Sequence, residues 1–413
     1  MSNTQKKNVP ELRFPGFEGE WEEKKLGDLT DRVIRKNKNL ESKKPLTISG
    51  QLGLIDQTEY FSKSVSSKNL ENYTLIKNGE FAYNKSYSNG YPLGAIKRLT
   101  RYDSGVLSSL YICFSIKSEM SKDFMEAYFD STHWYREVSG IAVEGARNHG
   151  LLNVSVNDFF TILIKYPSLE EQQKIGKFFS KLDRQIELEE QKLELLQQQK
   201  KCYMQKIFSQ ELRFKDENGE DYPDWKEKKL GDITEQSMYG IGASATRFDS
   251  KNIYIRITDI DEKSRKLNYQ NLTTPDELNN KYKLKRNDIL FARTGASTGK
   301  SYIHKEEKDI YNYYFAGFLI KFEIDEQNNP LFIYQFTLTS KFNKWVKVMS
   351  VRSGQPGINS EEYAKLPLVL PNKLEQQKIA EFLDRFDQQI ELEKQKIEIL
   401  QQQKKGLLQS MFI

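Results

Sequence analysis

The run Gly295-Ala-Ser-Thr-Gly299-Lys300-Ser301 is the segment of this 413-residue chain that comes nearest to a catalytic motif, the phosphate-binding loop. A loop of that class needs four residues between its glycines so that the backbone can cradle the phosphates, and here there are three. No apolar strand ending in aspartate stands out as the partner that would hold Mg²⁺. The sequence therefore predicts no nucleotide-binding site at this run.

Other candidate chemistry is also incomplete. Asn329-Pro330-Leu331-Phe332 resembles the NPP[YF] signature of adenine methyltransferases, but the second proline is absent and no glycine-rich methyl-donor loop precedes it. The three histidines are scattered without the paired spacing of metal ligands: His133, His149 and His304. We therefore expect no catalytic residue, no metal site and no cofactor in this chain.

The elements around these residues come in two copies, offset by 204 residues. Trp21 followed by KKLGD recurs as Trp225 followed by KKLGD, and EQQKI at 171–175 recurs at 375–379. Aligning 166–208 with 370–412 gives 24 identities in 43 positions, whereas the blocks between these segments hardly match. Repetition of this kind predicts two copies of one structural unit, each with a variable block and a similar segment.

Both similar segments have the spacing of long coiled-coil helices. From Ile175 to Ile207, and again from Ile379 to Met411, the stripe advances by alternate steps of four and three residues. In each copy the apolar stripe is interrupted at the same two slots, once by glutamate and once by lysine: Glu189 and Lys200, then Glu393 and Lys404.

These interruptions predict that the helices pair antiparallel, because a parallel pair in register would bring like charges together. When facing residue numbers sum to 593, Glu189 faces Lys404 and Lys200 faces Glu393. The residues expected to pair in this register are Leu182, Ile186, Glu189, Leu193, Leu196, Lys200, Ile390, Glu393, Ile397, Leu400, Lys404 and Leu407. Alternatively, each helix packs on its own neighbouring block, since long helices need tertiary contacts in either arrangement.

The variable blocks have the pattern of mixed α/β domains. β-branched and aromatic runs predict strands at 105–107, 110–116, 252–260 and 315–322. Helical periodicity covers 121–138 and 330–349, and in both blocks a strand, such a helix and a glycine-containing loop follow in the same order. The expected fold class is α+β: two α/β domains alternating with two long helices that pair as an antiparallel coiled coil, in a pseudo-twofold arrangement.

Composition indicates a globular cytoplasmic protein. No stretch approaches the roughly 20 apolar residues that span a bilayer, so we expect no membrane contact. The start of the chain has no apolar signal region, and Cys113 and Cys202 are too few for a disulfide framework. The chain has a net charge of +5, and its positive excess lies in the blocks: residues 22–165 carry +3 and residues 226–369 carry +5, while the rest of the chain is slightly negative. This excess favours contact with a polyanion without requiring it.

The layout resembles the specificity (S) subunit of type I restriction–modification enzymes. The resemblance covers the chain from Leu12 onward and rests on W-x-x-K-K-L-G-D opening each block, on NDILFARTGASTGK (287–300), and on the run into each helix at 167–187 and 352–391. In the first block, FAYNKSYSNGYPLG (81–94) takes the place of LFARTGASTGK. A difference in that loop is expected if the two blocks read different sequences.

The resemblance implies a non-catalytic DNA-recognition subunit of an enzyme complex. Each target-recognition domain would read one half of a bipartite site in double-stranded DNA, and the paired helices would set the spacing and dock two methyltransferase (M) subunits. Motor-nuclease (R) subunits would join through these. The expected parts are a flexible N-terminal tail (1–10), recognition domain 1 (11–167), a spacer helix (168–210), recognition domain 2 (211–371) and a second spacer helix (372–413).

The candidate DNA contacts lie on loops that mix basic, amide and hydroxyl groups, since arginine suits guanine edges, asparagine and glutamine suit adenine, and lysine suits phosphate. In the second block they are Arg293, Thr294, Ser297, Thr298 and Lys300, with Arg352, Ser353 and Gln355. In the first block they are Asn84, Lys85, Ser86, Tyr87 and Ser88, with Arg147, Asn148 and His149. A solvated loop accounts for each residue alone equally well, so the prediction concerns the loops as groups.

Two other functions remain open at this point. One is a protein–protein adaptor that carries two binding domains on a helical rod. The other is an enzyme whose active site has no recognisable motif. A steep dependence of DNA affinity on salt distinguishes a DNA reader from an adaptor, and methylation by the chain without partners would indicate an enzyme.

Overall fold

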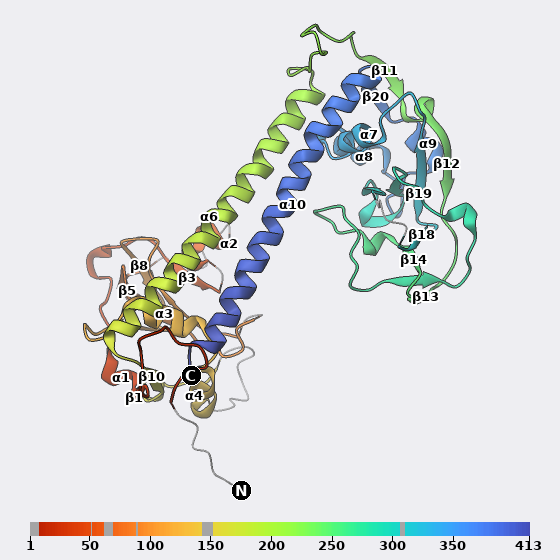
Figure 1. Cartoon of the computed structure of the whole chain (residues 1–413). Helices are drawn as coiled ribbons and strands as arrows, with labels where there is room; N and C mark the ends of the chain where they lie inside the picture. Colours follow the sequence, from red (N-terminus) through yellow and green to blue (C-terminus); the bar gives the residue numbers. More distant parts are fainter. Residues whose placement is uncertain (1–7, 51, 62–68, 88–89, 143–151, 306–309) are drawn as a thin grey trace. The chain divides into compact units, whose positions relative to one another are not determined.

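The computed structural model describes residues 8–50, 52–61, 69–87, 90–142, 152–305 and 310–413 (Figure 1). The chain divides into two compact units. Unit 1 is the chain up to Gln191 together with Glu393–Ile413, and unit 2 is Lys192–Leu392. Each unit therefore contains one variable block and a section of both long helices.

Unit 1 is a mixed α/β domain. Its strands are β1 (Glu22–Lys25), β2 (Thr30–Arg32), β3 (Leu46–Ser49), β4 (Gly53–Asp56), β5 (Thr74–Lys77), β6 (Phe81–Asn84), β7 (Ala95–Arg98), β8 (Ser104–Leu107), β9 (Tyr111–Ile116) and β10 (Leu163–Tyr166). Its short helices are α1 (Leu26–Leu29), η1 (Lys38–Leu40), α2 (Gln57–Phe61), α3 (Lys122–Asp130), α4 (Tyr135–Ile141) and α5 (Val156–Phe159). The main sheet is antiparallel, in the order β2-β9-β6-β7.

Unit 2 repeats this plan. Its strands are β11 (Lys226–Lys229), β12 (Thr234–Tyr239), β13 (Ala245–Arg247), β14 (Asn252–Ile255), β15 (Thr273–Pro275), β16 (Ile289–Ala292), β17 (Ser301–Ile303), β18 (Asn312–Phe315), β19 (Leu319–Ile324) and β20 (Pro367–Leu370). Its short helices are η2 (Leu230–Ile233), η3 (Ile257–Asp259), η4 (Asn280–Tyr282), η5 (Gly295–Ser297), α7 (Pro330–Phe336), α8 (Ser340–Met349) and α9 (Ser360–Ala364). The main sheet is again antiparallel, in the order β12-β19-β16-β17.

The central strands read as continuous apolar runs because both faces of each sheet are covered. In unit 2, Ile289 and Phe291 of β16 pack in one core, while Leu290 and Ala292 pack in the core on the other face. In unit 1, Phe81 and Tyr83 of β6 likewise belong to a different core from Ala82. Alternate residues of a strand point to opposite faces, so a strand covered on both sides needs apolar residues at every position.

The predicted strands are found with adjusted limits. β8 and β9 cover the runs expected at 105–107 and 110–116. The run at 252–260 forms β14 and then the short helix η3, and the run at 315–322 is shared between the end of β18 and β19. The equal strand order of the two main sheets confirms that the blocks share a fold although their sequences hardly match.

The helical stretches expected at 121–138 and 330–349 are each broken into two helices, α3 with α4 and α7 with α8. Hydroxyl side chains cause the breaks. Ser131 ends α3 and donates its Oγ hydrogen bond to the carbonyl of Tyr128, at 2.6 Å. Thr337 does the same to Tyr334, and Thr339 then caps α8 by accepting from the amide of Phe342. Side-chain bonds of this kind compete with the helical ladder.

The two spacer helices, α6 (Leu169–Phe208) and α10 (Lys373–Ser410), pair antiparallel as predicted (Figure 1). In unit 1, Phe179 of α6 packs against Phe412 beyond α10, with ring centroids 5.8 Å apart, and Glu190 accepts a bond from Gln401. In unit 2, Tyr203 packs against Phe382 and Phe386. The residue numbers of the contacts increase along α6 while they decrease along α10, so the two helices run antiparallel. Within the described residues, no helix has a run long and apolar enough to cross a membrane.

The predicted register of this pair is wrong. Lys404 bonds Asp183 at 2.6 Å, Lys200 bonds Asp387 at 2.6 Å, and Glu189 bonds Lys396 at 2.5 Å. The residue numbers of the two partners sum to 587 in both lysine pairs, whereas the predicted register required 593. Each residue of α6 therefore faces a residue of α10 about six positions earlier than predicted. The same shift displaces the pairings predicted for the other stripe positions, Leu182, Ile186, Leu193, Leu196, Ile390, Glu393, Ile397, Leu400 and Leu407, although none of these is fully exposed.

The register has two physical causes. The lysines are neutralised by aspartates that lie one residue beyond a stripe position, Asp183 and Asp387, rather than by the glutamates of the stripe. In addition, the end of α10 is fixed by burial, because Leu408, Met411 and Phe412 belong to the core of unit 1. A pairing rule that considers only the two helices does not contain this constraint.

The repeated sequence motifs act as structural anchors. The Arg13 guanidinium donates two hydrogen bonds of 2.7 Å to Glu171, which is 1% exposed at the start of α6. Arg213 does the same to Glu375 at the start of α10, with two bonds of 2.8 Å. Arg13 and Arg213 stand in the same tripeptide, Leu-Arg-Phe, at 12–14 and 212–214, and both glutamates open the repeated EQQKI motif. One buried ion pair in each unit thus explains both repeats, because it ties the chain entering a block to the helix leaving it.

Candidate nucleic-acid interface

In unit 2 the structure brings together the two loops predicted to contact DNA. One follows β16 and begins at Arg293, and the other follows α8 and contains Arg352. The amide of Gly295 donates to the carbonyl of Pro356 at 2.9 Å, and the amide of Ile358 donates to that of Arg293 at 2.9 Å. These loops form a hollow of about 250 Å³ lined by Arg293, Thr294, Arg352, Gln355, Pro356, Gly357, Ile358, Asn359 and Glu362.

Of the two arginines that line this hollow, Arg293 is the one whose charge is not balanced by a carboxylate within the described residues. Its guanidinium carbon lies 5.0 Å from the ring centroid of Tyr239, a cation–π arrangement that holds the side chain against β12. Its Nε is buried without a hydrogen-bond partner within the described part of the chain. The guanidinium is therefore oriented by an aromatic ring rather than neutralised by a carboxylate, which leaves its charge available to an anionic or carbonyl-bearing ligand.

Arg352 is held differently. Its Nη2 donates to both oxygens of Glu362 at 2.5 Å, and its Nη1 donates to the carbonyls of Met349 and Val351. Glu362 also accepts from the amide of Asn359, whose side chain caps α9. Arg352 is therefore positioned at the rim of the hollow with its charge balanced by Glu362.

The remaining members of the Arg293 loop maintain the shape of the loop. Lys300 is 6% exposed, and its Nζ contacts the carbonyl of Ile260 at 3.3 Å and the Glu262 carboxylate at 3.0 Å. Thr298 donates its hydroxyl to Gly295 at 2.8 Å. Gly295 itself has a φ of +73°, which suits glycine. Ser297, Thr298 and Lys300 do not line the hollow, so Arg293, Thr294, Arg352 and Gln355 form the candidate surface. Ser353 is exposed on the Arg352 loop.

The glycine-containing run at 295–301 is not a phosphate loop. A phosphate loop opens a helix whose amide end faces the phosphates, whereas here Lys300 is followed directly by strand β17. Asn329, of the methyltransferase-like sequence, caps α7 by accepting from the amide of Phe332 at 3.0 Å. The described residues contain no cluster of His, Cys, Asp or Glu that could hold a metal ion.

Unit 1 places its predicted loop at the same point of the sheet, because the β6–β7 hairpin corresponds to β16–β17. Asn84 ends β6 and accepts from the amide of Ser86 at 3.1 Å, and Lys85 Nζ contacts the carbonyl of Val154 at 3.3 Å. Tyr87 is 62% exposed at the tip. The other predicted members lie outside the described residues: Ser88, Arg147, Asn148 and His149.

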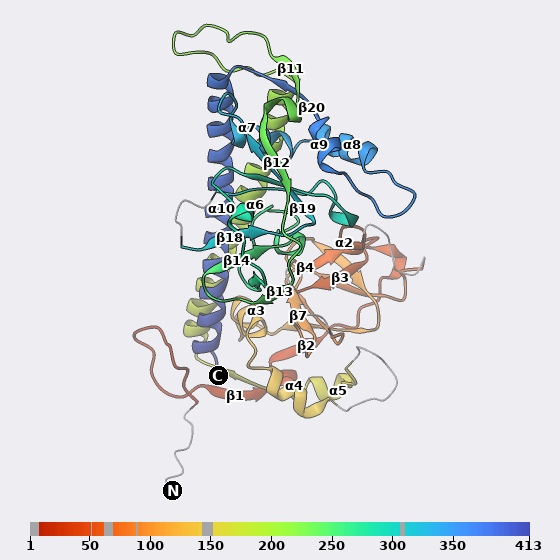
Figure 2. The same cartoon turned by 90° about the vertical axis from the view of Figure 1, so that its right-hand side faces the viewer.

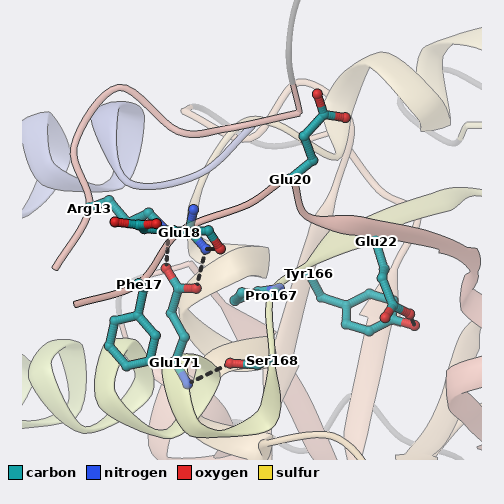
Figure 3. Close-up of a pocket in the computed structure, with 9 residues that line it drawn as sticks. All are labelled: Arg13, Phe17, Glu18, Glu20, Glu22, Tyr166, Pro167, Ser168 and Glu171. Atoms are coloured by element: carbon teal, nitrogen blue, oxygen red, sulfur yellow. Dashed lines mark hydrogen bonds and ion pairs between the residues drawn. The ribbon is translucent and has the colours of Figure 1, made fainter. Parts of the chain in front are cut away.

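A second hollow, in unit 1, has the opposite electrostatic character. It has a volume of about 220 Å³ and is lined by Arg13, Phe17, Glu18, Glu20, Glu22, Tyr166, Pro167, Ser168 and Glu171 (Figure 3). Figure 3 shows that its arginine is engaged with Glu171, so the remaining charge is that of the glutamates. Phosphates would be repelled from this site, which we therefore exclude from the nucleic-acid interface.

Three groups at the unit 2 hollow were not predicted from the sequence: Tyr239, Asn359 and Glu362. The spacing Asn359-x-x-Glu362 is a capping-box signal and could have indicated a helix start beside the loop. Tyr239 carried no such signal, because it lies 54 residues before Arg293 and meets it only through the pairing of β12 with β19 and of β19 with β16.

The duplicated units and their shared antiparallel helices define a protein with two tandem α/β domains joined by a pair of long helices. A family model described as "Type I restriction modification DNA specificity domain" matches residues 18–198 and 222–402, two stretches offset by the same 204 residues as the repeat. The chain belongs to this family, and the resemblance to a specificity subunit is confirmed.

Individual relatives agree. The chain is 25% identical, over 97% of its length and 93% of the relative's, to the type I restriction enzyme MjaVIII specificity subunit of Methanocaldococcus jannaschii. It is 28% identical over 46% of its length to the HindI specificity subunit of Haemophilus influenzae, covering 41% of that protein. Its fold is similar to the crystal structure of the type I restriction–modification S subunit from M. genitalium, with a TM-score of 0.61 and 16% identity, covering 98% and 99% of the two chains.

Proposed function

We propose that each unit of this specificity subunit reads one half of a bipartite sequence in double-stranded DNA. The hollow of unit 2 supports this most directly, because two sequence-distant loops join there and present Arg293 and Gln355 together. Arginine and glutamine are the side chains that bond guanine and adenine edges bidentately. In unit 1, the loop after Asn84 occupies the equivalent position of its sheet and carries a different sequence, as two different half-sites require.

The long helices set the distance between the half-sites and dock two methyltransferase subunits, through which motor-nuclease subunits join. The chain itself carries no catalytic residue in this proposal: methylation and cleavage belong to the partner subunits. Support comes from the helices, whose stripe residues repeat between copies while the loops diverge. The complex is expected to act in the cytoplasm, where cellular DNA and reduced cysteines coexist.

The decisive experiment is to map methylated adenines in cells that express this chain with its partners, and then with the two blocks exchanged. Exchange should yield the same two half-sequences in reversed order. Unchanged methylation after exchange, or methylation by the chain alone, would refute the proposal. A full-length chain whose DNA binding, with partners, is insensitive to salt would support the protein–protein adaptor instead.

A further inference from the structure

Helix α8 of unit 2 presents an exposed basic face beside the hollow. Lys341, Lys344 and Lys347 are exposed and have no ion pair within the described residues. Phe342 and Val346, on the opposite side of the helix, are buried at 0% and 9% exposure. With 3.6 residues per turn, the three lysines fall within about 120° of arc centred opposite these two anchors. The helix therefore offers three mobile ammonium groups on a fixed support.

This support is firmly attached to the candidate interface. Phe342 packs against Phe291 of β16 at 6.1 Å, immediately before the Arg293 loop. At the other end of α8, Arg352 donates to the carbonyl of Met349 at 3.1 Å, and the amide of Gly357 donates to Ser350 at 3.1 Å. Figure 2 shows α8 beside α9, joined by the loop that lines the hollow. The helix that carries the lysines is thus fixed to the loops that line the hollow.

The charge pattern of this region is specific to unit 2. The segment from Asn329, which caps α7, to Asn359, which caps α9, contains four basic residues and no acidic residue. The equivalent stretch of unit 1 runs from Ser121, which caps α3, to Ser155, which caps α5. It contains three basic and five acidic residues. Two segments of the same fold therefore differ by six charges, +4 against −2.

Resting on the proposed function, we infer that the Lys341–Lys344–Lys347 face is a clamp for the DNA backbone, and that α4, the corresponding helix of unit 1, does not supply one. The three lysines span about 9 Å of helix axis, which equals the rise of the duplex axis over two to three phosphates of one strand at about 3.4 Å each. Lysine binds phosphate as a point charge and carries no base preference. The second unit thus gains sequence-independent affinity from a face that the corresponding helix of the first unit does not supply.

The test compares full-length variants assembled with their methyltransferase partners. In Lys341→Gln/Lys344→Gln/Lys347→Gln, the slope of log affinity against log salt should fall in magnitude by about 2.7 on a duplex of arbitrary sequence, because each lost phosphate contact removes about 0.9. Between about 50 and 200 mM salt, the variant should therefore lose about 40-fold less affinity than the parent chain. The Lys→Arg triple variant should retain the parent slope.

Two controls make the result specific. The triple variant Lys226→Gln/Lys228→Gln/Lys251→Gln removes three other exposed lysines of unit 2, outside α8, and should keep the parent slope. Arg136→Gln removes the one basic residue of α4 and should change the slope by at most one contact. Equal effects of both lysine triples, or no effect of the α8 triple, would overturn the clamp.

Failure of the clamp is distinguishable from failure of the proposed function. If the parent complex shows a steep slope and the mapped half-sites exchange with the blocks, the reading function stands whatever α8 does. Methylated sequences should be the same in the α8 triple variant and the parent, since phosphate contacts do not specify bases. Loss of methyltransferase copurification with an unchanged DNA slope would assign α8 to a protein partner and refute the inference.

Discussion

Replacing Lys404 by methionine is expected to destabilise unit 1 by about 3 kcal/mol, more than the equivalent change at Lys200 destabilises unit 2. Lys404 has 17% of its side chain exposed and bonds Asp130 at 2.8 Å and Asp183 at 2.6 Å. Removing one member of a buried ionic cluster costs about 3–5 kcal/mol, because the remaining charges stay buried. The lower limit applies, since Asp130 retains Lys97 at 2.6 Å and Asp183 is 46% exposed.

The matched change, Lys200→Met, should cost about 1–2 kcal/mol. Its partner Asp387 is 34% exposed, so water can solvate the carboxylate, and Gln335 still donates to it at 2.7 Å. Methionine keeps most of the aliphatic volume in both variants, which restricts the comparison to the charge. The two lysines occupy equivalent positions of the repeat, so each variant serves as the control for the other.

Hydrogen exchange of the native protein is the appropriate assay, because two units need not unfold as one cooperative step. Protection should fall in α3 and the end of α10 for Lys404→Met, and in α7 for Lys200→Met. Equal losses in both variants, or a loss below about 1 kcal/mol at Lys404, would contradict the assignment of a buried cluster. Adding Asp183→Asn to Lys404→Met should recover part of the loss, with a coupling of about 1–3 kcal/mol.

Three further results are expected. Although burial favours the neutral form of Asp130, Lys97 and Lys404 lower the pKa of its carboxyl to about 2. The ion pairs of Asp130 therefore stabilise unit 1 above the ordinary pKa near 3.9, and this stabilisation should be lost as pH falls from about 4 through about 2. Hydrogen exchange during acid unfolding should show that Asp130→Asn lacks this pH-dependent part of the stability. Arg293→Ala should cost about 1–3 kcal/mol of discrimination in the second half-site and leave the first unchanged in methylation maps; equal loss in both would exclude base reading by Arg293. Inserting one heptad into both α6 and α10 should change the half-site separation by about three base pairs, from about 10 Å of added helix, while an unaltered separation would exclude a spacer role.

Sequence periodicity predicted the long helices and their direction because those features depend on residues within the helices. The stripe and the paired interruptions at Glu189 and Lys200 required only local counting. The register did not follow, because it is set by Asp183 beside the stripe and by Phe412 in the core of unit 1. A rule that considers only the two helices cannot predict contacts that depend on a third element, here the core of unit 1.

The candidate site shows the same division. Loop composition singled out the Arg293 and Arg352 segments, and the structure places these two loops side by side; whether they contact DNA stays a prediction. It could not separate Arg293, which stacks on Tyr239, from Lys300, which is buried against Ile260 and Glu262. The exposure of a side chain in a loop depends on which other segments the loop packs against, and the sequence of the loop alone does not predict those segments.

The apolar end of α10 has a consequence for biosynthesis. Leu408, Met411 and Phe412 are buried in the core of unit 1, together with Trp21 and other residues of the first block. Ribosomes deliver the chain from its N-terminus, and domains generally fold in that order. Here the order is reversed: every residue of unit 2 has been synthesised by Leu392, whereas the unit that begins first must wait for the last residues of the chain. Until then its incomplete apolar core is exposed to chaperones, and termination of synthesis between Leu392 and Leu408 would damage the first block more than the second.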